Sequence, residues 1–114
     1  MRKITQQAIA AFESFKDFKS GNTKVEAFNM EDFKMAKLFL HNNCIAELVE
    51  HTNGKKTLVL NSCGWKTTTT KERLNGIFGI QVNQKNYSWY LNGEIWNGKE
   101  ILLNWQNGRW TRAI

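Results

Sequence analysis

A run of four threonines between two lysines is the part of this sequence whose residue types are best suited to chemistry. Residues 66–73 are Lys-Thr-Thr-Thr-Thr-Lys-Glu-Arg. Thr69 and Glu72 have the spacing of a capping box, in which each side chain accepts a hydrogen bond from the other residue's backbone N–H. The pattern predicts a short helix from about Thr70 to Asn75. The N-terminus of such a helix attracts anions, because its first N–H groups have no partner within the helix.

Two interpretations of this segment stay open at the level of sequence. In the first, backbone N–H groups, hydroxyls and the flanking cations hold a phosphate or carboxylate of a partner. Substitution of Lys71 or Arg73 then weakens binding with little effect on stability. In the second, Trp65 and Leu74 hold a corner between a strand and a helix, and Thr69 only caps that helix.

Positive charge and aromatic residues are both concentrated in the second half of the 114-residue chain. Residues 1–50 contain seven basic and seven acidic side chains, whereas residues 51–114 contain nine basic and three acidic ones. The second half therefore carries the whole formal charge of +6, together with all five tryptophans and both tyrosines. Cations interleaved with aromatic rings suit a phosphate backbone with bases that can stack. The alternative is that the lysines keep a small protein soluble and the rings fill its core.

The residues expected to contact nucleic acid or another partner combine these two features. Trp110, between Arg109 and Arg112, is the aromatic residue expected to be most exposed. The alternative for Trp110 is that it docks a terminal strand on the core. The full predicted contact set is Lys66, Thr67, Thr70, Lys71, Arg73, Lys85, Trp89, Tyr90, Arg109, Trp110 and Arg112.

The spacing of apolar residues predicts the elements that position this set. An apolar stripe predicts an N-terminal helix, which Ser20-Gly21-Asn22 should end. The period changes to two from Thr23 onward, which predicts strands at 23–28, 33–40, 44–50, 56–62, 80–84 and 87–91. The stripe consists of Ile4, Ala8, Ala11, Phe12, Phe15 and Phe18.

Asparagine–glycine pairs predict how the strands connect. Five of the eight glycines follow an asparagine, and this dipeptide readily adopts the positive φ angles of a type I′ hairpin turn. We therefore expect residues 1–114 to form a single globular α+β domain. Its single curved antiparallel sheet should have the N-terminal helix packed on one face and a short second helix after the fourth strand.

Residues that could catalyse a reaction or bind a metal show no recognisable arrangement. His41, His51, Cys44 and Cys63 belong to no catalytic, metal-binding or phosphate-binding motif. We therefore expect a protein that is not an enzyme and needs no cofactor and no metal, with a small nuclease as a third alternative. No apolar run approaches the length of a membrane span, and the first residues lack the apolar block of a signal peptide. These features predict a cytoplasmic protein without membrane contact.

Three stretches of the chain resemble a family of small proteins that tailed phages and prophages encode. They are residues 38–46, 64–76 and 89–98, and their most specific part is Gly-Trp-x-Thr-x-Thr-Thr-x-x-Arg-Leu-Asn, which begins at Gly64. Such proteins often have His-Gly-Asn where this chain has His-Asn-Asn at 41–43. The resemblance implies no particular biochemical activity for this chain. It implies a viral accessory protein in the cytoplasm of an infected bacterial host.

Two functions remain for such a protein. The first is a non-enzymatic phage accessory protein that binds nucleic acid or a nucleoprotein through its basic, aromatic C-terminal half. The second is a protein-binding inhibitor of a host or anti-phage defence component, for example an anti-CRISPR-like or host-takeover factor. Affinity capture from lysate with and without nuclease treatment separates them, and the oligomeric state is not predicted by the sequence.

Overall fold

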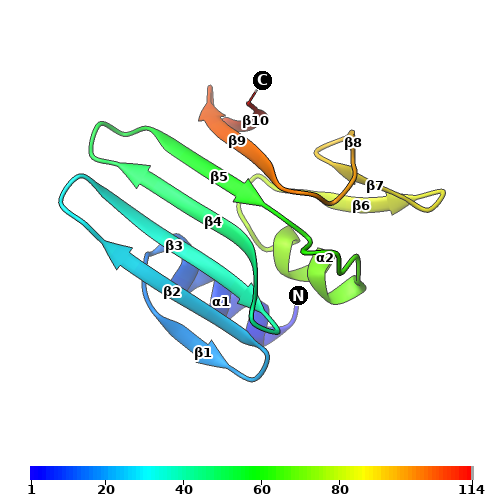
Figure 1. The fold of residues 1–114 in the computed structure, drawn as a ribbon, viewed down its shortest axis with the longest axis horizontal. Coiled ribbons are helices and arrows are strands. Elements are labelled where there is room, and N and C mark those ends of the chain that lie inside the picture. Colours follow the sequence, from blue (N-terminus) through cyan, green and yellow to red (C-terminus); the bar gives the residue numbers. More distant parts are fainter. Residues whose placement is uncertain (114) are drawn as a thin grey trace.

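The computed structural model describes residues 1–113 and arranges them in two helices and ten strands (Figure 1). The helices are α1 (Lys3–Glu13) and α2 (Thr68–Asn75). The strands are β1 (Phe18–Ser20), β2 (Thr23–Asn29), β3 (Phe33–Leu40), β4 (Asn43–His51), β5 (Lys56–Leu60), β6 (Val82–Lys85), β7 (Ser88–Leu91), β8 (Glu94–Trp96), β9 (Ile101–Gln106) and β10 (Arg109–Arg112).

The strands form two antiparallel sheets. Within the described residues, one sheet has seven strands in the order β1-β2-β3-β4-β5-β9-β10, and the other has three in the order β6-β7-β8. The prediction of an α+β fold built on a single sheet is therefore wrong, because the protein is mostly β with two short helices. Strand β5 pairs directly with β9, so α2 and the small sheet are an insertion between two neighbouring strands. Alternating apolar residues predict strands, but they do not specify such distant partners.

Helix α1 is shorter than the apolar stripe predicts. Its last helical residue is Glu13, and Phe15 has a φ of 55°, in the left-handed region where helices commonly end. Phe18 consequently lies in β1, and Gly21 with Asn22 forms the turn to β2 instead of ending the helix. The buried side of α1 consists of Thr5, Ala8, Ile9 and Phe12.

One face of the seven-stranded sheet, the covered face, shares a single hydrophobic core with both helices and the small sheet. Strands β2, β3, β5 and β9 contribute to it Val25, Leu38, Leu58 and Leu103, each at most 2% exposed. A bulge in β4 adds one residue, because the pairing moves from Leu38 with Ala46 to Phe39 with Cys44. Ile45 and Ala46 are therefore both buried although they are consecutive.

Two of the predicted Asn-Gly hairpins have the expected conformation, whereas Asn97 and Gly98 lie between β8 and β9, which belong to different sheets, so the hairpin expected there is wrong. Asn92 and Gly93 join β7 to β8 with positive φ at both positions, and residues 107–108 join β9 to β10 in the same way. Gly76 ends α2 with a φ of −71°, which confirms the predicted end of this helix at Asn75. A Cβ at Gly76 would lie 2.6 Å from Ile9 Cγ1, so the close approach of α1 requires glycine there.

As far as residues 1–113 are concerned, no helix is long and apolar enough to cross a membrane.

Candidate functional site

A groove of about 580 Å³ lies beside the small sheet and the start of β9. It brings together three members of the predicted contact set, Lys66, Trp89 and Arg112, from three separate parts of the chain. Its complete lining is Lys66, Tyr87, Ser88, Trp89, Ile95, Trp96, Asn97, Lys99, Glu100, Ile101 and Arg112.

Trp89 positions two ammonium groups at this groove. The Nζ atoms of Lys66 and Lys71 lie 6.0 Å and 5.9 Å from the centroid of its ring, within the range of cation–π attraction. The indole is only 2% exposed and packs against Trp96, with 6.0 Å between the ring centroids. Trp89 therefore cannot stack on a base. Gly98 leaves room for the lysine, because a Cβ there would lie 2.8 Å from Lys66 Cε.

The groove has an excess of positive charge. Lys66, Lys71 and Lys99 form no ion pair with any residue of the described chain. Arg112 is neutralised by Glu94, whose carboxylate lies 3.3 Å from the Arg112 Nε atom. Lys66 and Lys99 line the groove together with one carboxylate, that of Glu100, and the Lys71 ammonium lies next to the lining residue Trp89.

Two exposed aromatic side chains adjoin these lysines, and neither belongs to the predicted contact set. Tyr87 is 97% exposed and lies in the β6–β7 turn with a φ of 68°, which is rare for a bulky residue. Trp65 is 62% exposed and directly precedes Lys66. Trp65 lies outside the predicted strand segments, and this position is a sequence signal that could have identified it. Tyr87 is the first residue of the strand predicted at 87–91, but β7 begins only at Ser88.

Thr67, and not Thr69, caps helix α2. The Thr67 hydroxyl oxygen accepts a hydrogen bond from the Thr70 backbone N–H at 3.1 Å and lies 3.0 Å from the Thr70 hydroxyl. The predicted Thr69–Glu72 capping box is wrong, because the Glu72 carboxylate accepts hydrogen bonds from Thr5 and Arg2 instead. Thr67 and Thr70 thus stabilise the start of α2.

A second cavity, of about 560 Å³, lies beside this cap and is lined by Leu40, His41, Asn43, Ile45, Ser62, Trp65, Thr67, Thr69 and Thr70.

Arg73 occupies the centre of a buried polar network that joins α1, α2 and β2. It is 1% exposed, and it donates hydrogen bonds to Thr23 Oγ1 at 3.1 Å and to Thr5 Oγ1 at 2.7 Å. It also forms an ion pair with Glu72. Burial raises the pKa of Glu72, but hydrogen bonds from Thr5, the Arg2 backbone and Arg73, with the charge of Arg73, outweigh it and hold that pKa below its ordinary value. Arg73 is thus a structural residue that no partner can reach.

Lys85 and Tyr90 are not brought to the groove lysines. Lys85 pairs with Ser88, and Tyr90 pairs with Asn83, whereas Trp89 occupies the alternate position on the same strand. Because successive residues of a strand point to opposite faces, Lys85 and Tyr90 lie on the other face of the small sheet from Trp89.

Trp110 docks the last strand on the core, as the alternative interpretation of this residue states. Its exposed fraction is 9%, its Nε1 donates to the Phe78 carbonyl at 3.0 Å, and its ring lies 5.0 Å from that of Trp105. The expectation that Trp110 is exposed is therefore wrong. Arg109 is exposed on the same strand but does not line the groove.

The thiols of Cys44 and Cys63 are both weak nucleophiles. Burial, with a smaller contribution from Glu47, raises the pKa of Cys44 to about 11, and burial also raises the pKa of Cys63. Both thiols therefore stay protonated at neutral pH, in the form that reacts poorly. In the part of the chain that the structure describes, no three His, Cys, Asp or Glu side chains are grouped to hold a metal ion.

Comparison with known proteins places this architecture in a viral family. No curated protein and no solved structure matches the chain. The model of one family, described as Kyanoviridae Gp96 protein, matches residues 1–112 and so includes both sheets, α2 and the lysines of the groove. This match confirms the prediction that the chain belongs to a family of tailed-phage proteins. The chain belongs to the Kyanoviridae Gp96 protein family.

Proposed function

We propose that this phage protein is a non-enzymatic accessory protein that binds nucleic acid, free or in a nucleoprotein, through the groove beside the small sheet. The observation that supports the proposal is that Lys66, Lys71 and Lys99 adjoin one groove without an ion-pair partner among the described residues. Ammonium groups held in this way contact phosphates and release the counterions that surround them.

The exposed rings favour a single-stranded ligand. Tyr87 and Trp65 bury little of their surface in the fold, so their faces are free to stack on bases. The bases of a duplex are already stacked on one another, whereas those of a single strand are accessible. We therefore expect single-stranded oligonucleotides to bind more tightly than duplexes. The setting that we propose is the cytoplasm of the infected bacterial host.

Fluorescence anisotropy titrations with labelled single-stranded and duplex oligonucleotides, repeated at several salt concentrations, test this proposal. Three phosphate contacts predict a log–log slope of about −2 for a single strand, at about 0.7 per contact. Lys66→Gln and Lys71→Gln should each make the slope shallower by about 0.7. Lys16→Gln is the matched control, because Lys16 is exposed in the loop after α1 and should leave the slope unchanged.

Tyr87→Ala separates stacking from charge. It should weaken binding by about 1–3 kcal/mol without changing the salt dependence, because it removes a ring and no cation. Absence of binding at low salt would end the nucleic-acid proposal. The inhibitor of a host or defence protein would then be the candidate to pursue, by affinity capture with nuclease treatment.

A further inference from the structure

The second cavity, beside the cap of α2, lies between parts of the chain that are distant in sequence. It has a volume of about 560 Å³ and is bounded by the β3–β4 turn, the segment from β5 to α2 and the first residues of α2. Leu40, Ile45 and Trp65 give it apolar walls. Such a volume and such walls are typical of a small-molecule site, which also needs a few polar groups that face the ligand.

Ser62 provides one such group, because its hydroxyl has no hydrogen-bond partner among residues 1–113. The residue is 2% exposed, and only its backbone is bonded, the N–H to the Gly98 carbonyl at 2.8 Å and the carbonyl to the Trp65 N–H at 2.9 Å. Every fully enclosed side-chain oxygen and nitrogen of the described residues has a partner. The Ser62 hydroxyl must therefore touch open space, and Ser62 lines this cavity.

The start of α2 supplies backbone donors to the same cavity. Thr68 and Thr69 are the first two residues of the helix, so their N–H groups have no acceptor within it. Thr67 and Thr69 line the cavity, which places this end of the helix at its wall. The N–H groups and the partial positive charge of a helix N-terminus favour an anion.

A chain of hydrogen bonds determines how His41 presents its ring. Arg73 can only donate, so the Thr23 hydroxyl accepts from it at 3.1 Å and gives its own proton to Asn22 Oδ1 at 2.8 Å. Asn22 therefore turns its amide nitrogen toward His41, with 3.4 Å between Asn22 Nδ2 and His41 Nε2. Nε2 of the neutral ring is then the acceptor, and the proton lies on Nδ1. His41, which lines the cavity, thus has an N–H donor that Asn22 does not use.

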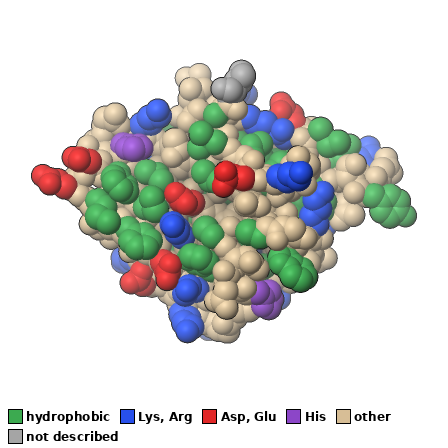
Figure 2. All heavy atoms as spheres, viewed as in Figure 1, with side chains coloured by type: hydrophobic (Ala, Val, Ile, Leu, Met, Phe, Trp, Pro, Cys, Tyr) green, Lys and Arg blue, Asp and Glu red, His purple; other side chains and the backbone are tan. Residues whose placement is uncertain are grey.

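The surroundings of the cavity do not repel an anion. None of the described residues that line it is acidic. Figure 2 shows a histidine beside a hydrophobic side chain, and no acidic side chain, where α2 and the β3–β4 turn lie in Figure 1. Arg2 Nη2 donates to Thr69 Oγ1 at 3.4 Å. Arg2 and Arg73 share the single carboxylate of Glu72, so two cations and one anion leave a net charge of +1 next to the cavity.

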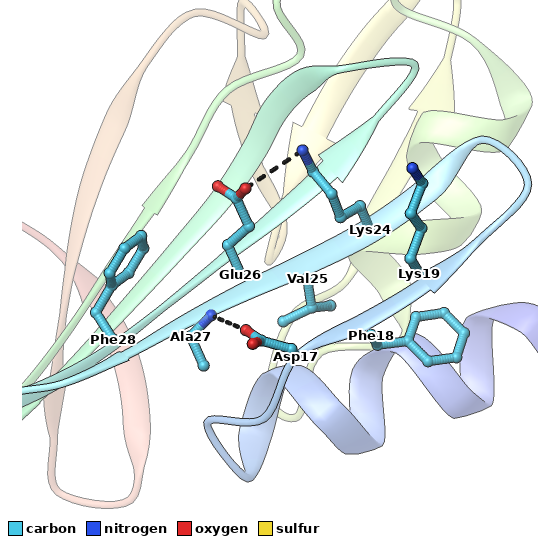
Figure 3. A pocket seen from close by; sticks show the side chains of 8 residues that line it. All are labelled: Asp17, Phe18, Lys19, Lys24, Val25, Glu26, Ala27 and Phe28. Atoms are coloured by element: carbon cyan, nitrogen blue, oxygen red, sulfur yellow. Dashed lines mark hydrogen bonds and ion pairs between the residues drawn. The ribbon is translucent and has the colours of Figure 1, made fainter.

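The hollow beside β1 and β2 has the opposite character (Figure 3). Its Asp17 carboxylate accepts from the Ala27 N–H at 2.8 Å, and its Glu26 carboxylate lies 3.3 Å from Lys24 Nζ. Two carboxylates that are paired within the fold repel an anion without offering it a donor. That hollow therefore does not suit the ligand that the cavity beside α2 suits.

We propose that the cavity beside α2 binds a nucleoside monophosphate. A phosphate monoester offers three strong acceptor oxygens to the donors of its wall and carries a charge of about −1.5 to −2. The Trp65 ring is 62% exposed, so it has a face on which a base stacks. A volume of about 560 Å³ exceeds what a phosphate ion needs and accommodates a sugar and a base as well. This site is separate from the groove beside the small sheet and does not depend on the function proposed for that groove.

Isothermal titration calorimetry of the purified full chain with AMP, GMP, CMP and UMP tests the proposal. At least one of them should bind, and inorganic phosphate and the matching nucleoside should each bind about tenfold more weakly or not at all. Ser62→Ala should raise the dissociation constant about tenfold, because it removes a hydrogen bond to a charged group. Its Tm should stay unchanged, since the lost oxygen has no partner in the described fold. Ser14→Ala is the matched control, because Ser14 is exposed after α1 and should change neither value.

Ring and charge variants separate this cavity from the groove. Trp65→Ala should raise the dissociation constant of the nucleotide about tenfold, because it removes the stacking face. Tyr87→Ala and Lys99→Gln should leave nucleotide binding unchanged, since both residues line the groove and not the cavity. Four nucleotides that all fail to bind at millimolar concentration, a nucleoside that binds as tightly as its nucleotide, or a complex that Lys99→Gln weakens and Ser62→Ala does not would each overturn the proposal. Oligonucleotide binding by the groove is measured separately, so failure of one proposal leaves the other standing.

Discussion

Replacement of Arg73 by methionine should destabilise the fold severely and so distinguish a structural arginine from a contact arginine. The substitution keeps an unbranched apolar stem and removes the guanidinium group. Arg73 donates to the hydroxyl oxygens of Thr5 and Thr23 and forms an ion pair with Glu72, and its own exposed fraction is 1%. Sequence alone allowed this residue to contact a partner, in which case its loss would leave stability nearly unchanged.

The magnitude follows from what remains after the guanidinium is removed. Breaking a buried ion pair by removal of one partner costs about 3–5 kcal/mol. The Glu72 side chain is 23% exposed and keeps an ion pair with Arg2 at 3.6 Å, so water and Arg2 partly compensate for the loss. We therefore expect the lower end, about 3 kcal/mol. For a domain of this size, that corresponds to a fall in Tm of about 12 °C, at about 4 °C per kcal/mol.

Urea and thermal unfolding, followed by circular dichroism and tryptophan fluorescence, measure the effect. Lys71→Met is the matched control on the same helix, because Lys71 reaches outward to Gln84 Oε1 at 3.2 Å and to the Trp89 ring. It should cost less than about 1 kcal/mol, as is usual for exposed charges. If Arg73→Met costs no more than Lys71→Met, the buried network does not stabilise the fold and the reasoning is refuted.

Three further substitutions test other contacts in the fold. Thr67→Ala should lower the unfolding free energy by about 0.5–2 kcal/mol in urea melts, because it removes the cap of α2; exposed Thr68→Ala is the control and should cost less than half as much. Phe12→Ala should cost about 3–5 kcal/mol, since the ring is fully buried in the core, and an unchanged Tm would contradict the assignment of Phe12 to the core. Because the pKa of Glu72 is lowered in the folded state, its contribution is complete above its ordinary pKa and is lost as the pH falls through the lowered value. Urea melts from neutral to acidic pH should therefore show a smaller acid loss for Glu72→Gln than for the parent, and equal slopes would refute this assignment.

Local features of the fold could be predicted from sequence because local chemistry determines them. The turn at Asn107-Gly108 needs positive φ at two consecutive residues, and this dipeptide tolerates both. Apolar spacing identifies Ala8 and Phe12 on the buried side of α1, but it does not identify Thr5 and Ile9, which are buried as well. The pairing of β5 with β9 could not be predicted, because α2 and the small sheet separate these strands in the chain. The need for glycine at position 76 could not be predicted either, because it arises from the close approach of Ile9, which belongs to a helix far away in the sequence.

The residues that the structure gathers at the groove were foreseen in part, and the differences have a common physical cause. Basic and aromatic composition indicates the half of the chain in which the groove lies, where Lys66 lines it and the Lys71 ammonium lies beside Trp89. Composition cannot state which side of a strand faces the core. Trp89 and Trp110 are therefore buried where exposure was expected, whereas Tyr87, in a turn, is fully exposed.

The face of the seven-stranded sheet that points away from α1 shows why exposure has to be argued from register and not from residue type. Met35 and Leu38 are both apolar residues of β3, and the period of two assigns them to opposite faces without stating which face is covered. Only the position of α1 decides this, and it buries Leu38 completely while Met35 stays partly exposed. A sheet with apolar residues on both faces needs two coverings to remove them from water. Within residues 1–113 the chain supplies one covering, and Met35 with its paired neighbours Phe28 and Val49 stays outside it.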